Sequence, residues 1–409
     1  MESVSKRISS LLLGSIVVNQ LEEFLKQHEL PYSGNVTKKL DTIYEAMDSN
    51  EEIKDDFNNF LCNQAKYTNN RVVITTPIKI TMSSPLRDIF AFKKKFPNYL
   101  NFNNIAVFED DELKTLFEED KYEFLQVYEN IDVDGERIES ISKAFAKLKV
   151  QNINDELTGE TIVRNHLEFV WIDVFPQERY YRIYLSEPLN NTNGQLSKES
   201  SYEKFSKMIE DLYSCTPTAH SSGNVLYKIY KNLTDVAESP YVERVEAFYE
   251  DIDKFVEDVS NKLEYSDQGY NSISLNTRVK KLLERAIIQQ DFKFYSETTT
   301  DREGFVEKFQ YQDPTGGRVQ ASTNGDTYDM SKHDIYFDTK ETIAINKILN
   351  VLWVKWYKPE FVNGERVIKQ IKIRYESHSK YYITHFLYNK VTREDCEYVL
   401  PKFDEYEKK

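Results

Sequence analysis

Three side chains in the last quarter of the chain have the types and spacing of a metal-dependent hydrolase. In "DTYDMSKHDIYFDTK", residues 326–340, the Ile-Tyr-Phe run predicts a strand that ends at Asp338. Because alternate residues of a strand point to the same side, Asp338 and Lys340 share a face, and Asp326 or Asp329 supplies a second carboxylate. Two hard oxygen ligands and a lysine suit Mg²⁺-assisted hydrolysis of a phosphodiester.

This arrangement resembles the PD-(D/E)xK nuclease family, in which an aspartate and an acid-x-Lys pair on adjacent strands hold a divalent metal. The resemblance implies that Asp329 and Asp338 are metal ligands and that Lys340 joins them as a catalytic residue. The spacing by itself is common, since this composition yields about nine acid-x-base pairs by chance. Apart from this Mg²⁺ no cofactor is expected, because the chain lacks a glycine-rich phosphate loop, a CxxC pair, HExxH and GxSxG.

A second pattern with chemical meaning lies near the N-terminus. Apolar residues repeat at helical spacing over 17–29, and Leu-Pro-Tyr-Ser-Gly at 30–34 predicts a turn that leads into a second short helix. The pattern resembles the SAP motif, a two-helix DNA-binding module. The resemblance implies that Gly34 allows close backbone approach and that Lys38 and Lys39 contact phosphates at the start of the second helix.

The strongest local excess of positive charge lies at 351–390, where eight basic residues outnumber three acidic ones. In "RVIKQIKIRYE" strand alternation places Lys372 and Arg374 on one face and apolar residues on the other. Interleaved cations and aromatic rings on a sheet suit single-stranded nucleic acid. The expected contacts are Lys369, Lys372, Arg374 and Tyr382, and the alternative is a strand with a solvated polar face and an aromatic core.

Composition excludes several classes of protein. The 40% hydrophobic and 13% aromatic content excludes wholesale disorder. A net charge of -15 opposes wrapping of nucleic acid over the whole surface, so any contact must be local. Three scattered cysteines (Cys62, Cys215 and Cys396) and an apolar run at 11–18 that is too short to span a bilayer predict a cytoplasmic protein with unpaired thiols and no membrane partner.

The elements that position these residues predict a multidomain α+β protein. We expect a helical SAP-like module at 1–68, a mixed α/β domain at 69–190, a linker and helical hairpin region at 191–290, and a C-terminal β-rich α+β domain at 291–409. Within the second domain, periodicity predicts a helix over 110–130. Further on, "EFVWIDVF" and "RYYRIYLSE" predict a β-hairpin.

A long acidic helix is expected over 240–263, capped by Ser239-Pro240, with apolar residues at steps of three or four. Its opposite face carries Glu243, Glu246, Glu250, Asp253 and Glu257. Two interpretations remain open. The helix packs antiparallel against the basic helix expected at 277–290, or it docks a protein partner.

These patterns favour a nucleic-acid-binding protein of bacterial or phage origin, with DNA as the expected ligand. A role in phage–host conflict, such as antiviral defence, is a hypothesis that rests on the lack of metabolic motifs. Two alternatives stay open: a Mg²⁺-dependent nuclease with Asp338 and Lys340 in its site, and a scaffold subunit that docks its partner through the 240–263 helix.

Overall fold

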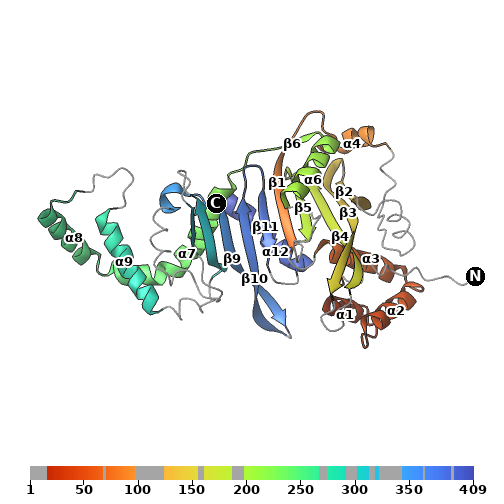
Figure 1. Cartoon of the computed structure of the whole chain (residues 1–409), viewed down its shortest axis with the longest axis horizontal. Coiled ribbons are helices and arrows are strands. Elements are labelled where there is room, and N and C mark those ends of the chain that lie inside the picture. The colour runs from red at the N-terminus through yellow and green to blue at the C-terminus, as the bar shows by residue number, and fades with distance from the viewer. Residues whose placement is uncertain are drawn as a thin grey trace, which may run out of the picture. The chain divides into compact units, whose positions relative to one another are not determined.

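The structure is a computed structural model that describes residues 16–67, 71–97, 124–154, 161–186, 198–266, 274–291, 302–312, 318–321, 343–362, 364–387 and 391–409. It divides the chain into two units. Unit 1 comprises Met1–Thr218 with Lys390–Arg393, and unit 2 comprises Ala219–Asn389 with Glu394–Lys409. Both combine helices with antiparallel strands, which confirms the α+β class (Figure 1). The finer division into four domains stays a prediction.

Unit 1 begins with three helices, α1 (Val18–Gln27), α2 (Val36–Met47) and α3 (Glu51–Lys66). Helix α1 buries Leu21, Phe24 and Leu25 on one face, as their spacing predicts. The Phe24 ring packs against Phe57 of α3, with ring centroids 5.6 Å apart. The two expected short helices therefore share a core with a third one.

The last turn of α3 is fixed to the unit 1 sheet by a buried ion pair. Lys66 Nζ donates to Asp173 Oδ2 at 2.6 Å and lies over the rings of Trp171 and Tyr184. Burial by itself lowers the pKa of Lys66, but Asp173 and a neighbouring tyrosine outweigh that effect and raise it. Lys66 therefore stays charged and holds the helical module against the sheet.

The strands of unit 1 are β1 (Arg71–Ile80), β2 (Leu125–Asp134), β3 (Arg137–Asn154), β4 (Thr161–Phe175), β5 (Tyr180–Ser186) and the short β6 (Cys215–Pro217). They pair in the order β2-β3-β4-β5-β1, and β6 pairs with β1. The predicted hairpin is confirmed, since β4 and β5 pair antiparallel from Phe175 opposite Tyr180 onward. The unit also contains the 3₁₀ turn η2 (Pro85–Arg87), α4 (Ile89–Lys95) and α6 (Lys198–Tyr213).

The helix predicted over 110–130 is wrong where the structure describes it, because 125–130 belong to strand β2. The strand pairs antiparallel with β3 along nearly its whole length, with two register shifts. Val127 and Glu129 point into the unit and are buried, and Glu129 pairs there with Lys143 of β3. This cross-strand pairing, which joins residues distant in sequence, overrides the local helical period.

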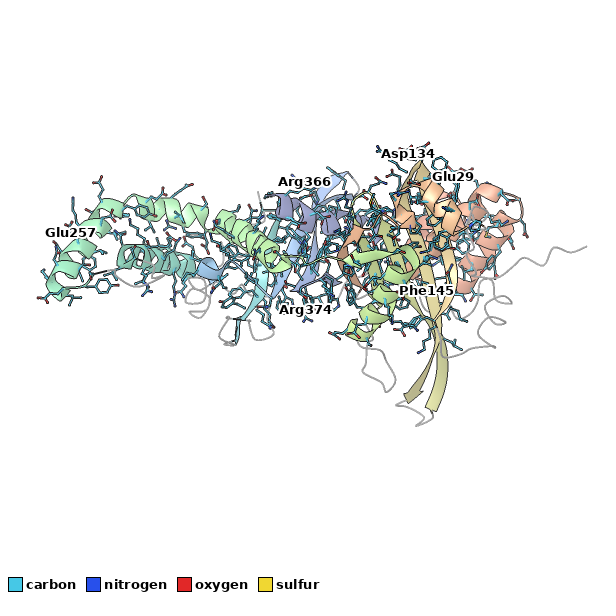
Figure 2. All side chains as sticks on the ribbon, turned by 90° about the horizontal axis from the view of Figure 1, so that it is seen from above. Glu29, Asp134, Phe145, Glu257, Arg366 and Arg374 are labelled. Atoms are coloured by element: carbon cyan, nitrogen blue, oxygen red, sulfur yellow. The ribbon has the colours of Figure 1, made fainter. Side chains whose placement is uncertain are left out.

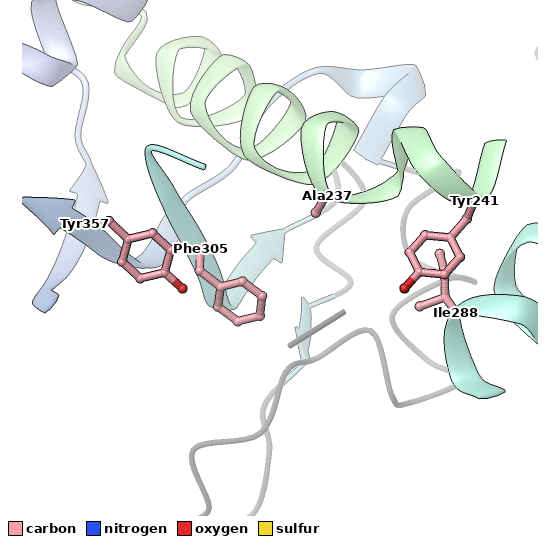
Figure 3. Packing of buried hydrophobic residues seen from close by; sticks show 5 residues of the cluster. All are labelled: Ala237, Tyr241, Ile288, Phe305 and Tyr357. Atoms are coloured by element: carbon pink, nitrogen blue, oxygen red, sulfur yellow. The ribbon is translucent and has the colours of Figure 1, made fainter. Parts of the chain in front are cut away.

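Unit 2 contains α7 (Ser222–Glu246), α8 (Tyr249–Leu263), α9 (Leu275–Gln290), β7 (Gly304–Gln312), β8 (Arg318–Ala321), β9 (Val351–Val362), β10 (Glu365–Ser377), β11 (Tyr382–Phe386) and α12 (Arg393–Lys408). Its strands pair antiparallel in the order β11-β10-β9-β7-β8. Helices α7 and α9 meet strands β7 and β9 in an apolar cluster of Ala237, Tyr241, Ile288, Phe305 and Tyr357 (Figure 3). This cluster ties the helical hairpin to the strands.

The single helix expected over 240–263 is wrong, because Pro240 lies inside α7 and the chain breaks between Glu246 and Tyr249 before α8 begins. In α8 only part of the predicted apolar stripe is buried. Ile252 and Val256 of α8 are buried against Leu275 and Val279 of α9. Packing of the acidic helix on the basic one is thus confirmed. No helix in the described part of the chain is long and apolar enough to cross a membrane.

Candidate nucleic-acid interface

The turn between α1 and α2 has the backbone geometry that its sequence predicts. Gly34 has φ of +108°, a conformation that other residues rarely adopt, and a Cβ there would lie 2.8 Å from the Lys38 side chain. Asn35 caps α2, since its side chain accepts a hydrogen bond from Lys38 N at 2.9 Å. By helix geometry the N–H groups of Val36 and Thr37 have no partner within α2. The start of α2 is therefore an exposed, positively polarised end.

The two lysines that the SAP resemblance marks have opposite environments. Lys38 is exposed, and its amine forms no ion pair with any of the described residues. Lys39 is only 5% exposed, and its amine pairs with Glu22 of α1 at 2.5 Å. That pair lowers the pKa of Glu22. Lys39 therefore joins the two helices, and Lys38 alone remains open to a phosphate.

Lys26 adds a second exposed cation beside the turn. Its Nζ lies over the ring of Tyr32 at 4.8 Å, and Tyr32 itself is about half exposed. No carboxylate among the described residues forms an ion pair with Lys26. We define the turn surface as Lys26, Tyr32, Lys38 and the N-terminus of α2. Sequence reasoning missed Lys26 and Tyr32, although Lys26 precedes the turn at 30–34 by one helical turn and Tyr32 lies within it.

The alternation predicted for β10 is confirmed. Ile371, Ile373 and Tyr375 are buried, and the residues between them face the other side of the strand. Strand β10 also pairs antiparallel with β11, with Ser377 opposite Tyr382. The local structure that carries the basic residues is thus the expected one.

Each of the three cations expected to bind nucleic acid on β10 has an acidic neighbour. Lys369 Nζ lies 2.9 Å from Asp395 Oδ2, Lys372 Nζ 3.5 Å from a carboxylate oxygen of Glu307, and Arg374 3.3 Å from Glu376. The acids come from α12, β7 and β10 itself. Figure 2 further shows Arg366 and Arg374 on opposite sides of unit 2. The basic residues of this hairpin do not form one uncompensated patch.

Asp395 is the centre of the largest of these ion clusters. Its carboxylate is buried and accepts hydrogen bonds from both Lys358 and Lys369. Burial lowers the pKa of Lys358, but the interactions with Asp395 and Glu360 together outweigh burial and raise it. The cluster connects α12 to β9 and β10, which is a structural role.

Aromatic residues of unit 2 are also engaged by their own protein. Tyr382 is 3% exposed and stacks on Phe403 of α12, with ring centroids 3.7 Å apart. Trp353 lies between two cations, Lys308 at 4.7 Å and Arg374 at 5.2 Å. Burial, and then Arg374, lower the pKa of Lys308. Tyr382 is therefore core and offers no face to a base.

The residues of the expected magnesium site, Asp329, Asp338 and Lys340, lie outside the described residues, as does Asp326. The nuclease hypothesis therefore stays a prediction. In the described ranges, no three His, Cys, Asp or Glu side chains group closely enough to hold a metal ion.

A second group of exposed cations lies on α4. Lys93 and Lys94 are exposed, and neither forms an ion pair with an acid in the described part of the chain. The signal in the sequence was the run of three lysines at 93–95.

Comparison with protein-family models and with curated proteins finds no match to this chain.

Proposed function

We propose that this protein binds DNA through the turn surface of its N-terminal module. The supporting observation is that Lys26 and Lys38 are exposed without ion pairs to described acids, beside a helix N-terminus whose first N–H groups are free. A phosphate placed at the start of α2 accepts backbone N–H bonds and attracts both amines. Tyr32 provides an exposed ring at the same place.

The proposal assigns no direct phosphate contact to the β10 cations. Lys369 and Lys372 must first leave Asp395 and Glu307. Of these two acids Asp395 is buried, so its ion pair resists opening because a buried charge would lose a partner. In a chain of net charge -15, uncompensated cations dominate local attraction to phosphate. The three free cysteines, of which Cys62 and Cys215 have their pKa raised to about 12 by burial, fit the cytoplasmic location that we propose.

Titration of a fluorescent 20-base-pair duplex at several salt concentrations tests this proposal. Lys26→Gln combined with Lys38→Gln removes two phosphate contacts, so the log–log salt slope becomes shallower by about 1.8. Lys254→Gln combined with Lys262→Gln, on exposed α8 positions, removes the same charge elsewhere and leaves the slope unchanged. Equal slopes for the two variants and the parent would refute the proposal.

A protein partner for α8 is a second candidate function, favoured by a specific observation. Phe255 is 58% exposed and Leu263 71% exposed on a helix whose polar face carries Glu250, Asp251 and Glu257. Figure 2 shows Glu257 near the end of this helical arm. Exposed large apolar side chains beside acids suit a basic amphipathic helix.

Photo-crosslinking from position 255 in cells tests this second candidate. We expect a discrete crosslinked partner that disappears when Phe248 and Leu263, both exposed, are replaced by serine. The Lys254→Gln/Lys262→Gln protein is the control and retains the crosslink. Absence of a discrete product, or a product that survives the serine substitutions, would reject the docking role.

A further inference from the structure

A shallow hollow of about 660 Å³ lies beside η2 and α4 of unit 1. Met82, Arg87, Phe90 and Lys94 contribute to its lining. Figure 1 shows α4 and the α1–α2 pair at separate ends of the unit 1 ribbon, so the hollow is not part of the turn surface. The hollow is lined by both charged and apolar side chains.

Arg87 lines the hollow and is positioned by two hydrogen bonds. Arg87 Nη1 donates to the carbonyl oxygen of Met82 at 3.0 Å, and Nε donates to Asp88 Oδ2 at 3.1 Å. Asp88 also caps α4 by accepting from Ala91 N at 2.7 Å, and this bond, followed by Arg87, lowers the pKa of Asp88. A guanidinium carries five N–H groups, so the remaining ones are available to an anion.

The lysines of α4 add charge beside Arg87. Lys95 Nζ donates to the carbonyl oxygen of Leu212 at 2.6 Å, which holds this end of the helix. Lys93 and Lys94 are exposed and form no ion pair with a described acid. Their position in the last turn is where a helix favours cations. Asp88, already engaged with Arg87, is the acid among the lining residues, so the hollow is net positive.

Two large apolar side chains that line the hollow are exposed to solvent. Met82 is 88% exposed and Phe90 is 62% exposed. Phe90 lies on α4 one turn before Lys94, so its ring and that amine are neighbours on one helix face. A ring next to free cations provides both elements that a nucleotide strand needs, a stacking face for a base and charge for its phosphates.

We propose that this hollow binds single-stranded nucleic acid, with a base on Phe90 and Met82 and the adjoining phosphates at Arg87 and Lys94. A duplex keeps its bases stacked and hidden, so it cannot use the ring. A bilayer is flat and leaves a concave site uncovered, whereas a flexible strand fills it. The site is independent of the turn surface, and its ligand differs in strandedness.

Fluorescence anisotropy with labelled dT20 tests the inference on the full chain. Lys94→Gln makes the log–log salt slope shallower by about 0.7, the value for one phosphate of a single strand. Phe90→Ala weakens binding about tenfold and leaves the salt slope unchanged, because stacking does not release counterions. The Lys254→Gln/Lys262→Gln protein binds dT20 like the parent. Thermal melts of each variant establish that these exposed substitutions preserve the fold.

Any of three outcomes would overturn the inference. The first is that the unsubstituted protein does not bind dT20, and the second is that the α4 variants bind dT20 with unchanged affinity and salt slope. The third is that the unsubstituted protein binds phosphatidylserine vesicles in a Phe90-dependent manner but does not bind dT20. Parallel titration with the 20-base-pair duplex keeps the two proposals distinguishable. Loss of duplex binding in the Lys26→Gln/Lys38→Gln protein concerns only the turn surface, and loss of dT20 binding in the α4 variants concerns only the hollow.

Discussion

The α1–α2 turn and the β9–β10 hairpin both carry lysines that the sequence marks as phosphate ligands, and they differ in what lies beside those lysines. At the turn, Lys26 and Lys38 have no ion pair with a described acid. At the hairpin, Lys369 and Lys372 are paired with Asp395 and Glu307. The hairpin has the larger local excess of positive charge, yet less of that charge is available.

The difference shows that a count of charges along a stretch of sequence includes only the acids of that stretch and omits acids that other segments bring close in space. Asp395 reaches β10 from α12, and Glu307 reaches it from β7, which is the strand paired on the other side of β9. Pairing of this kind is a tertiary effect. Within the helical module the same distinction separates Lys39, paired with Glu22, from its neighbour Lys38.

The largest expected effect belongs to a third group of charges, Asp329, Asp338 and Lys340. If these residues form a magnesium site, Asp338→Ala removes a metal ligand, and Mg²⁺-dependent cleavage of a phosphodiester substrate falls by about 100-fold or more. Gel assays with Mg²⁺ and with EDTA measure it. A parent protein that cleaves no DNA or RNA would end the nuclease hypothesis, and Asp334→Ala serves as the matched control in the same segment.

The next largest effect tests whether the hairpin cations are structural. Asp395→Asn leaves Lys358 and Lys369 with only the more exposed Glu360 as a shared acid, so we expect a loss of about 3 kcal/mol in the free energy of unfolding. Urea denaturation at pH 7 measures it. Glu376→Gln, which removes the partner of Arg374 at a more exposed place, should change stability by about 1 kcal/mol or less. Equal effects from both substitutions would contradict the structural assignment.

The third effect, a change of about tenfold in affinity for duplex DNA, is smaller and compares the two regions directly. Lys26→Gln/Lys38→Gln should weaken duplex binding by about tenfold at 0.1 M salt, because free amines are lost. Lys369→Gln/Lys372→Gln should leave affinity within about twofold, because those amines are already neutralised. Anisotropy titrations of the two double variants side by side decide the point. The reverse order of effects would restore the hairpin as the interface.

The smallest effect compares two adjacent lysines. Lys39→Ala should lower Tm by about 2–4 °C through loss of a packed stem and its ion pair, whereas Lys38→Ala should leave Tm unchanged. Lys39 lowers the pKa of Glu22 below its ordinary value of 4.5. The stabilisation from the pair is therefore fully present above pH 4.5 and is lost as pH falls through the lowered pKa. Thermal melts at pH 7 and pH 3 should show the difference between parent and Lys39→Ala shrinking, and a constant difference would assign the effect to packing alone.

Local patterns predicted much of the fold where period and packing agree. The alternation in β10 was confirmed because that strand has one consistently buried face, and the β4–β5 hairpin was confirmed because two apolar runs lie a few residues apart. The expectation failed at β2, where pairing with β3 outweighed helical spacing. It also failed at Pro240, which is exposed inside α7 while the buried Ala237 and Tyr241 hold this helix against α9, β7 and β9. Both errors arise where contacts between distant segments supply more free energy than local preference.

For the candidate interface, the sequence alone determined the Gly34 turn, the capped start of α2 and the alternating faces of β10, because backbone conformation depends on near neighbours. Only the tertiary structure decided which cations remain available. Lys39 is paired with Glu22 of another helix, and Lys369 is paired with Asp395 of α12. The physical reason is that an ion pair depends on distance in space, which is fixed when helices and strands far apart in the chain pack together.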